Sequence, residues 1–167
     1  MNNPILAYFI TFTTYGTWLH GDERGSIVRQ DGTTLKLGKH TGIHKHEYQK
    51  LKNDPVTLNS AKRQIVLETI IKHCDIRQWH LYAVHVRSNH VHIVVKSNKS
   101  ADLTASELKN WSARMLRKEG FDIPMVWTRG GSNKMIFTKP KLKEKIHYVV
   151  YEQGEMMEYY IDKAFAK

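Results

Sequence analysis

Residues 79–96 read WHLYAVHVRSNHVHIVVK, and this stretch decides the fold. Two runs rich in β-branched and aromatic residues flank the polar triplet Arg87-Ser88-Asn89, which suits a tight turn, so the stretch predicts a central β-hairpin. Side chains alternate between the two faces of a strand. His90 and His92 should therefore project together from one face, whereas the valines and isoleucine between and after them should project from the other.

Upstream of the hairpin, the sequence predicts one strand, one insertion and one helix. Residues 4–14, PILAYFITFTT, have the β-branched and aromatic content of a buried strand. Residues 21–57 carry Gly, Asp, Lys and His without a sustained period, so we expect a long loop there, either a solvated excursion or a basic flap over nucleic acid. Between residues 59 and 74 apolar residues recur at helical spacing, with Asn59 or Ser60 as N-cap.

Downstream of the hairpin, a second helix and further strand segments are expected. Thr104 and Glu107 match a capping box that would open this helix, and Gly120 would end it. Residues 124–138 hold two short strand candidates divided by Gly130-Gly131. They predict either a second hairpin or one interrupted edge strand.

A last long helix is predicted before the tail of the chain. Thr138 and Pro140 suit its cap and first turn, and Gly154 would stop it. Residues 155–167 are expected to form a short further helix. The apolar stripe that should face the core consists of Leu142, Ile146, Val149 and Val150.

The order strand, helix, strand, strand, helix, strand predicts an α+β fold of the ferredoxin-like plan, an antiparallel sheet with helices on one face. A chain of 167 residues suits one domain, so we expect residues 1–167 to form it, with the insertion at 21–57. This plan hosts many functions, and the function must therefore be argued from particular residues.

The charge balance favours a polyanionic partner. The formal net charge is +10, and the basic residues are spread along the chain, which is typical of proteins that bind nucleic acid. No stretch approaches the ~18 apolar residues of a membrane span, so no membrane partner is expected. The single cysteine, Cys74, excludes an intrachain disulfide and a Cys-rich zinc site, and a cytoplasmic location is expected.

The histidine pair is the first candidate for chemistry. Two imidazoles one strand period apart can grip a metal ion, although a His-x-His pair alone is more often two surface histidines on an exposed sheet face. Here Asn89-His90-Val91-His92 resembles the HUH motif of single-strand nucleases and transposases, in which the central residue is hydrophobic. With the opening FTTYGTWLHGDERG at residues 12–25 and a tyrosine on the last helix, the chain resembles the single-tyrosine HUH transposases, a family that includes insertion-sequence single-strand transposases and REP-associated tyrosine transposases.

The resemblance implies a nucleophilic tyrosine on the last helix, where only Tyr148 and Tyr151 lie among eight tyrosines. Helical amphipathicity does not separate these two. Tyr148 has Glu152 four residues on, stacked on the same side of the helix, whereas the equivalent partner of Tyr151 lies beyond the expected stop at Gly154. Tyr148 is therefore the expected nucleophile.

The third metal ligand is less clear from the sequence. In the resembled families a Gln or Asn four residues after the tyrosine completes the metal site. Here that position holds Glu152, and Gln153 follows it. A carboxylate suits Mg²⁺ or Mn²⁺ at least as well as an amide, so Glu152 is expected to join His90 and His92, with Gln153 as the alternative.

The resemblance further implies a metal-dependent single-stranded DNA transposase and endonuclease. Such an enzyme recognises DNA hairpins, cleaves and rejoins strands through a 5′-phosphotyrosine intermediate, uses Mg²⁺ or Mn²⁺, and in some cases works as a homodimer. Trp111 is expected in the core rather than in contact with bases. The residues expected to contact single-stranded or hairpin DNA are Trp18, Arg87, Lys96, Lys109, Arg114, Arg129 and Lys145.

Three other functions are compatible with the same residues. A replication-initiator-type nickase would use the same histidines and tyrosine on a different DNA target. A non-catalytic protein that binds hairpin RNA or DNA would need only the charge and the aromatic residues. A metal-dependent hydrolase would cleave with water and form no covalent adduct.

Overall fold

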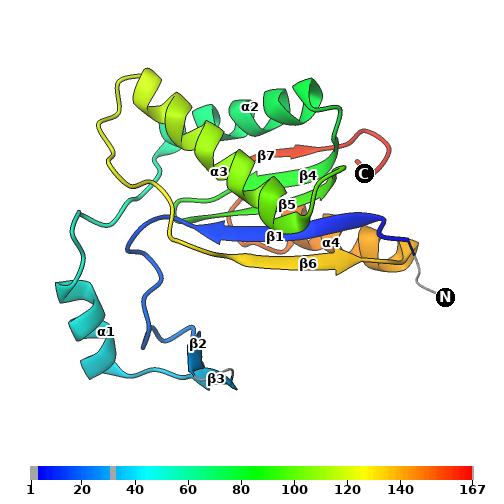
Figure 1. The fold of residues 1–167 in the computed structure, drawn as a ribbon. Helices are drawn as coiled ribbons and strands as arrows, with labels where there is room; N and C mark the ends of the chain where they lie inside the picture. The colour runs from blue at the N-terminus through cyan, green and yellow to red at the C-terminus, as the bar shows by residue number, and fades with distance from the viewer. Residues whose placement is uncertain (1–3, 31–32, 167) are drawn as a thin grey trace.

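The five-stranded antiparallel sheet at the centre of the molecule has the order β6-β1-β5-β4-β7 (Figure 1). A computed structural model describes residues 4–30 and 33–166. The first four strands of this order, β6-β1-β5-β4, reproduce the ferredoxin-like plan, and β7 extends the sheet beyond β4. The strands are β1 (Ala7–Thr13), β4 (His80–Val86), β5 (His90–Lys96), β6 (Ser132–Ile136) and β7 (Glu158–Ile161).

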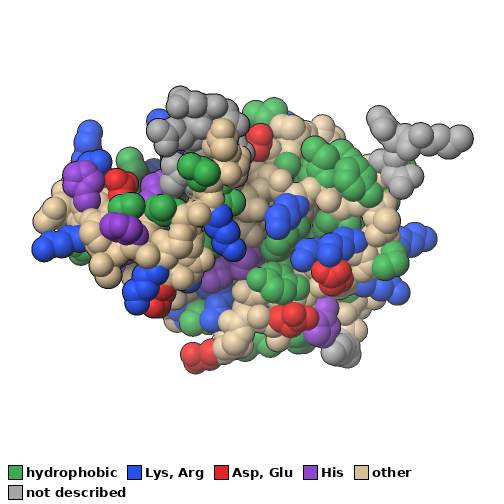
Figure 2. Space-filling model, turned by 90° about the horizontal axis from the view of Figure 1, so that it is seen from below, with side chains coloured by type: hydrophobic (Ala, Val, Ile, Leu, Met, Phe, Trp, Pro, Cys, Tyr) green, Lys and Arg blue, Asp and Glu red, His purple; other side chains and the backbone are tan. Residues whose placement is uncertain are grey.

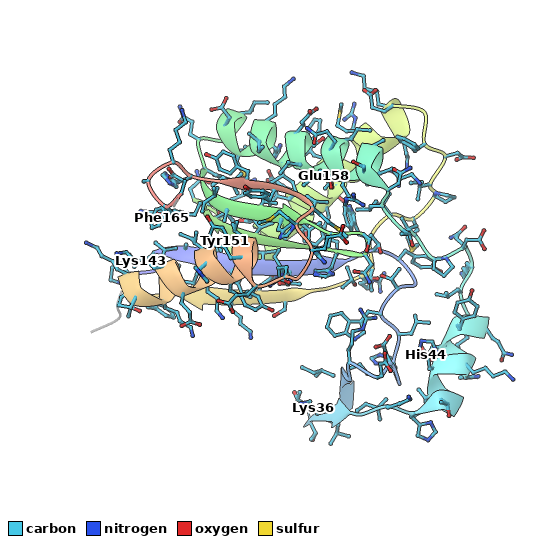
Figure 3. All side chains as sticks on the ribbon, turned by 180° about the vertical axis from the view of Figure 1, so that it is seen from behind. Lys36, His44, Lys143, Tyr151, Glu158 and Phe165 are labelled. Carbon is cyan, nitrogen blue, oxygen red and sulfur yellow. The ribbon has the colours of Figure 1, made fainter. Side chains whose placement is uncertain are left out.

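Helices cover both faces of this sheet. α2 (Ser60–Ile76) and α3 (Ala101–Lys118) pack over one face, and α4 (Lys139–Tyr151) packs over the other, in front of the sheet in Figure 3. The predicted α+β class and antiparallel sheet are confirmed, but the placement of helices on one face holds for α2 and α3 only. The reason is that Ala7, Phe9 and Val94 make the second face apolar as well, and such a face must be covered.

The predicted hairpin and helix caps are confirmed with one exception. Asn59 caps α2, and Thr138 caps α4. α3 begins earlier than the sequence predicts, because the Ser100 side chain accepts the N–H of Leu103 and serves as its N-cap. The capping box at Thr104 was therefore wrong, and the Thr104 hydroxyl instead donates to the Ser100 carbonyl inside the first turn.

The region after α3 forms one interrupted edge strand. Trp127 bridges Thr14, and β6 then pairs with β1 from Ser132 onward. At Gly131, between these two pairings, φ is 154° and a Cβ would lie 2.6 Å from the Thr11 carbonyl oxygen, so only glycine fits. Of the two alternatives, the structure therefore has the interrupted edge strand.

The tail forms a strand, and the predicted short helix at residues 155–167 is wrong. β7 pairs with β4 in antiparallel register, and it alternates between the two cores: Tyr160 packs with the α2 side and Ile161 with the α4 side. Aromatic and β-branched residues at period two are typical of a strand. The edge of β4 provided the partner that the local sequence could not reveal.

The insertion at residues 21–57 has structure of its own, so the expectation of a long loop was incomplete. It holds a two-stranded ribbon of β2 (Ser26–Gln30) and β3 (Thr33–Leu37), followed by α1 (Thr41–Gln49), which buries no residue. The segment lies beyond one end of the sheet (Figure 1). The N–H of Val56 donates to the Tyr15 carbonyl where the segment rejoins the body. Within the described residues, no helix has the length and apolar character needed to cross a membrane.

Candidate metal and tyrosine site

His90 and His92 stand side by side on β5, on the face that α4 covers. Their ring centroids are 4.7 Å apart. The Nδ1 of His92 lies 2.8 Å from the Thr11 hydroxyl, and the Nδ1 of His90 lies 2.7 Å from the Asn89 side-chain oxygen. With the protons on Nδ1, both Nε2 atoms are left as ligands, which is the usual arrangement of metal-binding histidines.

Both imidazoles are held in the neutral form that binds metal. Burial lowers the pKa of His90 to about 4, and the nearby charge of Arg87 adds to the effect. Burial also lowers the pKa of His92 to about 3, with a further contribution from His90. At neutral pH each ring therefore offers a lone pair rather than a positive charge.

The lowered pKa values predict that acid destabilises the metal-free protein. Both histidines have folded pKa values below the unfolded value of 6.5, so the unfolded chain binds more protons as the pH falls from about 6.5 towards 4. The contribution of the two neutral histidines to the free energy of unfolding is fully present above the unfolded pKa. It is lost as the pH falls through the folded pKa values. Urea unfolding with a chelator, between about pH 7 and pH 4, should show a falling free energy of unfolding. The double variant His90→Asn, His92→Asn should show a flatter dependence; an equally steep one would contradict this account.

Tyr148 reaches the histidine pair within a single chain. Its ring centroid lies 5.7 Å from that of His92 and 5.9 Å from that of Phe9. Lys145, one helical turn earlier, holds its Nζ 5.2 Å from the centroid of the Tyr148 ring. The Tyr151 ring instead lies against His147 at 5.1 Å. The structure therefore brings Tyr148 to the ring of His92, whereas Tyr151 contacts a side chain of its own helix.

Glu152 and Gln153 differ sharply in where they lie. α4 ends at Tyr151, so Glu152 is the C-cap and does not stack over Tyr148 as a helical residue would. Its carboxylate accepts a hydrogen bond from His147 Nδ1 at 2.8 Å, and its side chain is 54% exposed. The Gln153 amide nitrogen donates to the Tyr148 carbonyl at 3.0 Å, and its side chain lies close enough to His90 and His92 to act on the pKa of both. The geometry thus favours the alternative, Gln153.

Two more of the predicted residues lie near this site. The Arg87 guanidinium donates to the Glu155 carbonyl, and its charge acts on His90. Lys145 lies above both Phe9 and Tyr148. A third predicted residue, Trp18, is 39% exposed and donates its Nε1 to the Gly25 carbonyl in the segment beyond the end of the sheet.

The other predicted DNA contacts lie elsewhere. Lys96 is at the far end of β5 from His90. Lys109 donates to the carbonyls of Thr128 and Gly130 from α3, on the opposite face of the sheet from α4. Arg114 lies over Trp111, which is 40% exposed rather than in the core as expected, and Arg129 is exposed in the loop before β6. On the face seen in Figure 2, Lys and Arg side chains are spread out rather than gathered in one patch.

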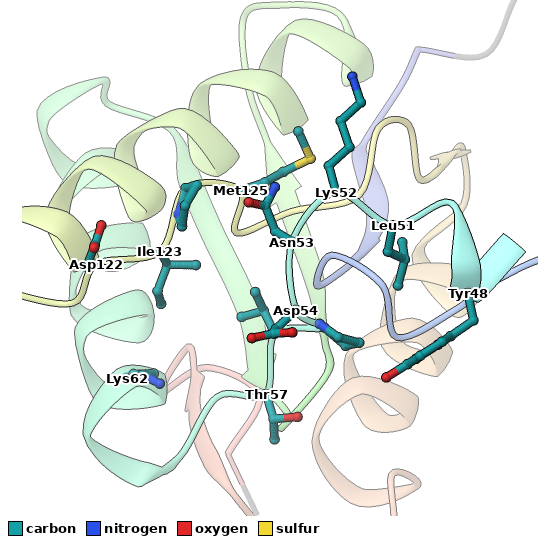
Figure 4. A pocket seen from close by; sticks show the side chains of 13 residues that line it. Tyr48, Leu51, Lys52, Asn53, Asp54, Thr57, Lys62, Asp122, Ile123 and Met125 are labelled. Carbon is teal, nitrogen blue, oxygen red and sulfur yellow. The ribbon is translucent and has the colours of Figure 1, made fainter.

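A large hollow lies apart from the histidine pair. It encloses about 830 Å³ between the end of the insertion, α2 and the loop after α3 (Figure 4). Tyr48, Lys52, Asn53 and Asp54 line it from the insertion, and Lys62 and Asp122 line it from the body. Neither histidine nor Tyr148 contributes to its wall, so the reacting groups and this hollow are separate features.

A metal ion would need the amide as well as the histidines. Among residues 4–30 and 33–166 no group of three or more His, Cys, Asp or Glu side chains is arranged to hold a metal. Two imidazoles and the Gln153 amide make a mixed nitrogen and oxygen donor set that suits Mn²⁺ and Mg²⁺. The neutral imidazoles, with Nδ1 atoms engaged, fit such an ion.

Sequence reasoning missed two residues beside the pair. Thr11 on β1 and His85 on β4 are the direct neighbours of His92 across the sheet. Counting outward from the turn at residues 87–89 would have placed His85 opposite His92. Thr11 could not be found in this way, because β1 is far away in the sequence and its register with β5 is a long-range property.

Comparisons with known proteins assign a family and support the fold. A family model described as "Transposase IS200 like" matches residues 43–132, just over half of the chain, and this range includes both histidines but neither β1 nor α4. No curated protein matches the sequence. A solved structure described as "Structure of the REP associates tyrosine transposase bound to a REP hairpin" is similar with a TM-score of 0.53 and 12% identity, over 91% of this chain and 70% of the other. That likeness supports the fold, and the sequence match assigns the family: this chain belongs to the IS200-like transposases.

Proposed function

We propose that this protein is a metal-dependent single-stranded DNA transposase and endonuclease that recognises hairpins and acts through a 5′-phosphotyrosine on Tyr148. The observation that carries the proposal is the contact between Tyr148 and His92, whose ring centroids are 5.7 Å apart within one chain. A phenol, two neutral imidazoles and a lysine converge where a phosphodiester could be attacked.

His90, His92 and Gln153 are the residues proposed to hold Mg²⁺ or Mn²⁺. Their contribution would be two Nε2 atoms and, because the amide nitrogen is engaged by the Tyr148 carbonyl, the side-chain oxygen of Gln153. A divalent cation bound there would polarise the scissile phosphate and stabilise the charge that develops on it. The buried, hydrogen-bonded histidines need little rearrangement to bind it.

Tyr148 supplies the nucleophile in this proposal. A phenol must lose its proton to attack phosphorus, and the Lys145 Nζ lies 5.2 Å from the centroid of this ring. The phenol loses its proton, its oxygen bonds to phosphorus, and the bond from phosphorus to the 3′ oxygen breaks, leaving a protonated 3′-hydroxyl. Because the new phosphodiester conserves the bond energy, a 3′-hydroxyl can later attack it and release Tyr148 without a nucleotide cofactor.

A DNA hairpin is the proposed partner. The related structure is described with a bound REP hairpin, and the net charge of +10 supports binding to a polyanion. Arg87 and Lys145 are the basic residues beside the reacting groups. Trp18 offers an exposed aromatic face for an unpaired base, with the Arg24 guanidinium 4.9 Å from its ring centroid.

Covalent capture of DNA tests the proposed function. The full chain would be incubated with single-stranded oligonucleotides that carry a hairpin and randomised flanks, with Mn²⁺ or with a chelator. We expect a protein–DNA adduct on a denaturing gel that requires the metal. Cleavage without an adduct would instead identify a hydrolase that uses water, and hairpin binding without cleavage would identify a non-catalytic binding protein.

The third ligand can be settled by two neighbouring substitutions. Gln153→Ala should weaken Mn²⁺ binding and slow adduct formation by on the order of 10–100-fold, because it removes the amide that lies beside both histidines. Glu152→Ala removes an exposed carboxylate bound to His147 and should leave Mn²⁺ affinity within a few-fold of the wild type. Isothermal titration with Mn²⁺ measures both. The opposite ranking would restore Glu152 as the ligand.

A further inference from the structure

His85 is a buried histidine whose two ring nitrogens both bind the backbone. It lies directly opposite His92 on β4 and is fully buried beneath α4. Its Nδ1 lies 2.9 Å from the Val149 carbonyl oxygen, and its Nε2 lies 3.1 Å from the Met157 nitrogen. A carbonyl can only accept and an N–H can only donate, so the ring must be neutral with its proton on Nδ1.

These two partners lie on either side of Gln153. Val149 is four residues before it, in the last turns of α4, and Met157 is four residues after it, immediately before β7. Arg87, two residues after His85 and directly after the end of β4, donates to the carbonyl of Glu155 in the same stretch. The end of β4 therefore holds the segment 149–157 at three backbone points.

We propose that His85 is a positioning residue, which with Arg87 clamps the segment 149–157 to the sheet so that the Gln153 amide faces His90 and His92. The inference rests on the proposed function, because it concerns the same metal site. A segment that leaves a helix loses backbone entropy for each residue it orders, and a long glutamine side chain loses more. The hydrogen bonds of His85 order this segment before any ion binds.

The ring of His85 makes two hydrogen bonds that an apolar side chain of similar size could not make. A leucine or phenylalanine could occupy a buried position between a sheet and a helix without the cost of burying an imidazole. A histidine in one tautomer is selected only where a donor and an acceptor must be matched together, here at the two ends of one segment. His85→Phe keeps a ring of similar size and removes both hydrogen bonds.

The test is Mn²⁺ affinity of the metal-free protein, measured by titration without DNA. His85→Phe should weaken Mn²⁺ binding by on the order of 10–100-fold, while hairpin affinity in a chelator stays at the wild-type value. The matched control is His73→Phe. His73 is another buried histidine, bonded to Glu107 on the opposite face of the sheet, so its loss should lower the melting temperature without changing Mn²⁺ affinity.

A double-mutant cycle asks whether His85 acts through Gln153. In a Gln153→Ala background, His85→Phe should have no further effect on Mn²⁺ affinity. His85→Gln, which keeps a donor and an acceptor, should recover much of the affinity. If His85→Phe does not fold, His85→Asn, which keeps a donor for Val149 but cannot also reach Met157, takes its place with an intermediate loss expected.

The outcomes separate this inference from the proposed function. If the wild-type protein binds Mn²⁺ and His85→Phe binds it with equal affinity, the proposed role of His85 is overturned but the metal site is not. Additive effects of the His85 and Gln153 substitutions would do the same. A wild-type protein that binds no Mn²⁺ would overturn the proposed metal site and this inference together. Amide exchange at Met157 that quickens in His85→Phe without loss of global stability would support the clamp.

Discussion

Tyr148→Phe should abolish the covalent protein–DNA adduct, by a factor on the order of 10³ or more, and leave hairpin binding unchanged. The substitution removes only the phenolic oxygen, so no nucleophile remains to form a bond with phosphorus. The Phe ring keeps the contacts with Phe9 and His92, and the variant should therefore fold and melt as the wild type does. Denaturing electrophoresis measures the adduct, and a mobility shift in a chelator measures binding.

Tyr151→Phe is the matched control for this experiment. Tyr151 lies on the same helix three residues further on, but its ring lies against His147. Adduct formation in this variant should stay near the wild-type rate. An adduct lost in Tyr151→Phe and kept in Tyr148→Phe would assign the nucleophile to the other tyrosine.

His90→Ala should remove metal-dependent cleavage, with a loss on the order of 10²-fold or more at fixed Mn²⁺. The substitution deletes one of two imidazoles whose rings are 4.7 Å apart, so a cation would keep too few protein ligands to be held. His90 is a better position than His92 for this test. His92 is more deeply buried and hydrogen-bonded to Thr11, so the loss of His92 would disturb packing as well. Cleavage rate as a function of Mn²⁺ concentration measures the effect.

His80→Ala controls for the loss of a histidine in the same hairpin. His80 pairs with Lys96 at the far end of β4 and β5, where its ring binds Asp162. Cleavage in this variant should match the wild type. If His90→Ala cleaved DNA at the wild-type rate with Mn²⁺ present, the histidine pair would have no metal role.

The parts of the fold with strong local periodicity could be predicted, and the parts that depend on distant partners could not. Alternation and the turn at residues 87–89 predicted β4 and β5, and helical spacing with Asn59 predicted α2. The residues of β7 were predicted to be helical. Their alternating side chains indicate a strand only once the free edge of β4 is known to lie beside them. In the same way, Ser100 displaced Thr104 as the cap of α3, since both residues suit the role in isolation.

In the candidate site, too, the features that depend on local pattern could be predicted, and those that depend on the course of the chain could not. Strand alternation was enough to predict that His90 and His92 lie together, and the family resemblance pointed to the last helix for Tyr148. That these residues bind a metal and attack DNA stays a prediction. The choice of Glu152 assumed that the helix continued to Gly154, and a four-residue spacing keeps two side chains together only inside a helix. Since α4 ends at Tyr151, Glu152 lies against His147 and the Gln153 side chain lies near both histidines. Which of the two binds a metal stays a prediction.

The end of α4 also has an electrostatic consequence for how DNA approaches. Tyr148 lies in the last turn, where the carbonyl groups carry the negative pole of the helix dipole, equivalent to about half an elementary charge, and no basic residue occupies that turn. Many proteins attract phosphate with the opposite, positive pole of a helix. Here the backbone repels a phosphate beside the nucleophile, so attraction must come from Lys145 and from charge held by the sheet.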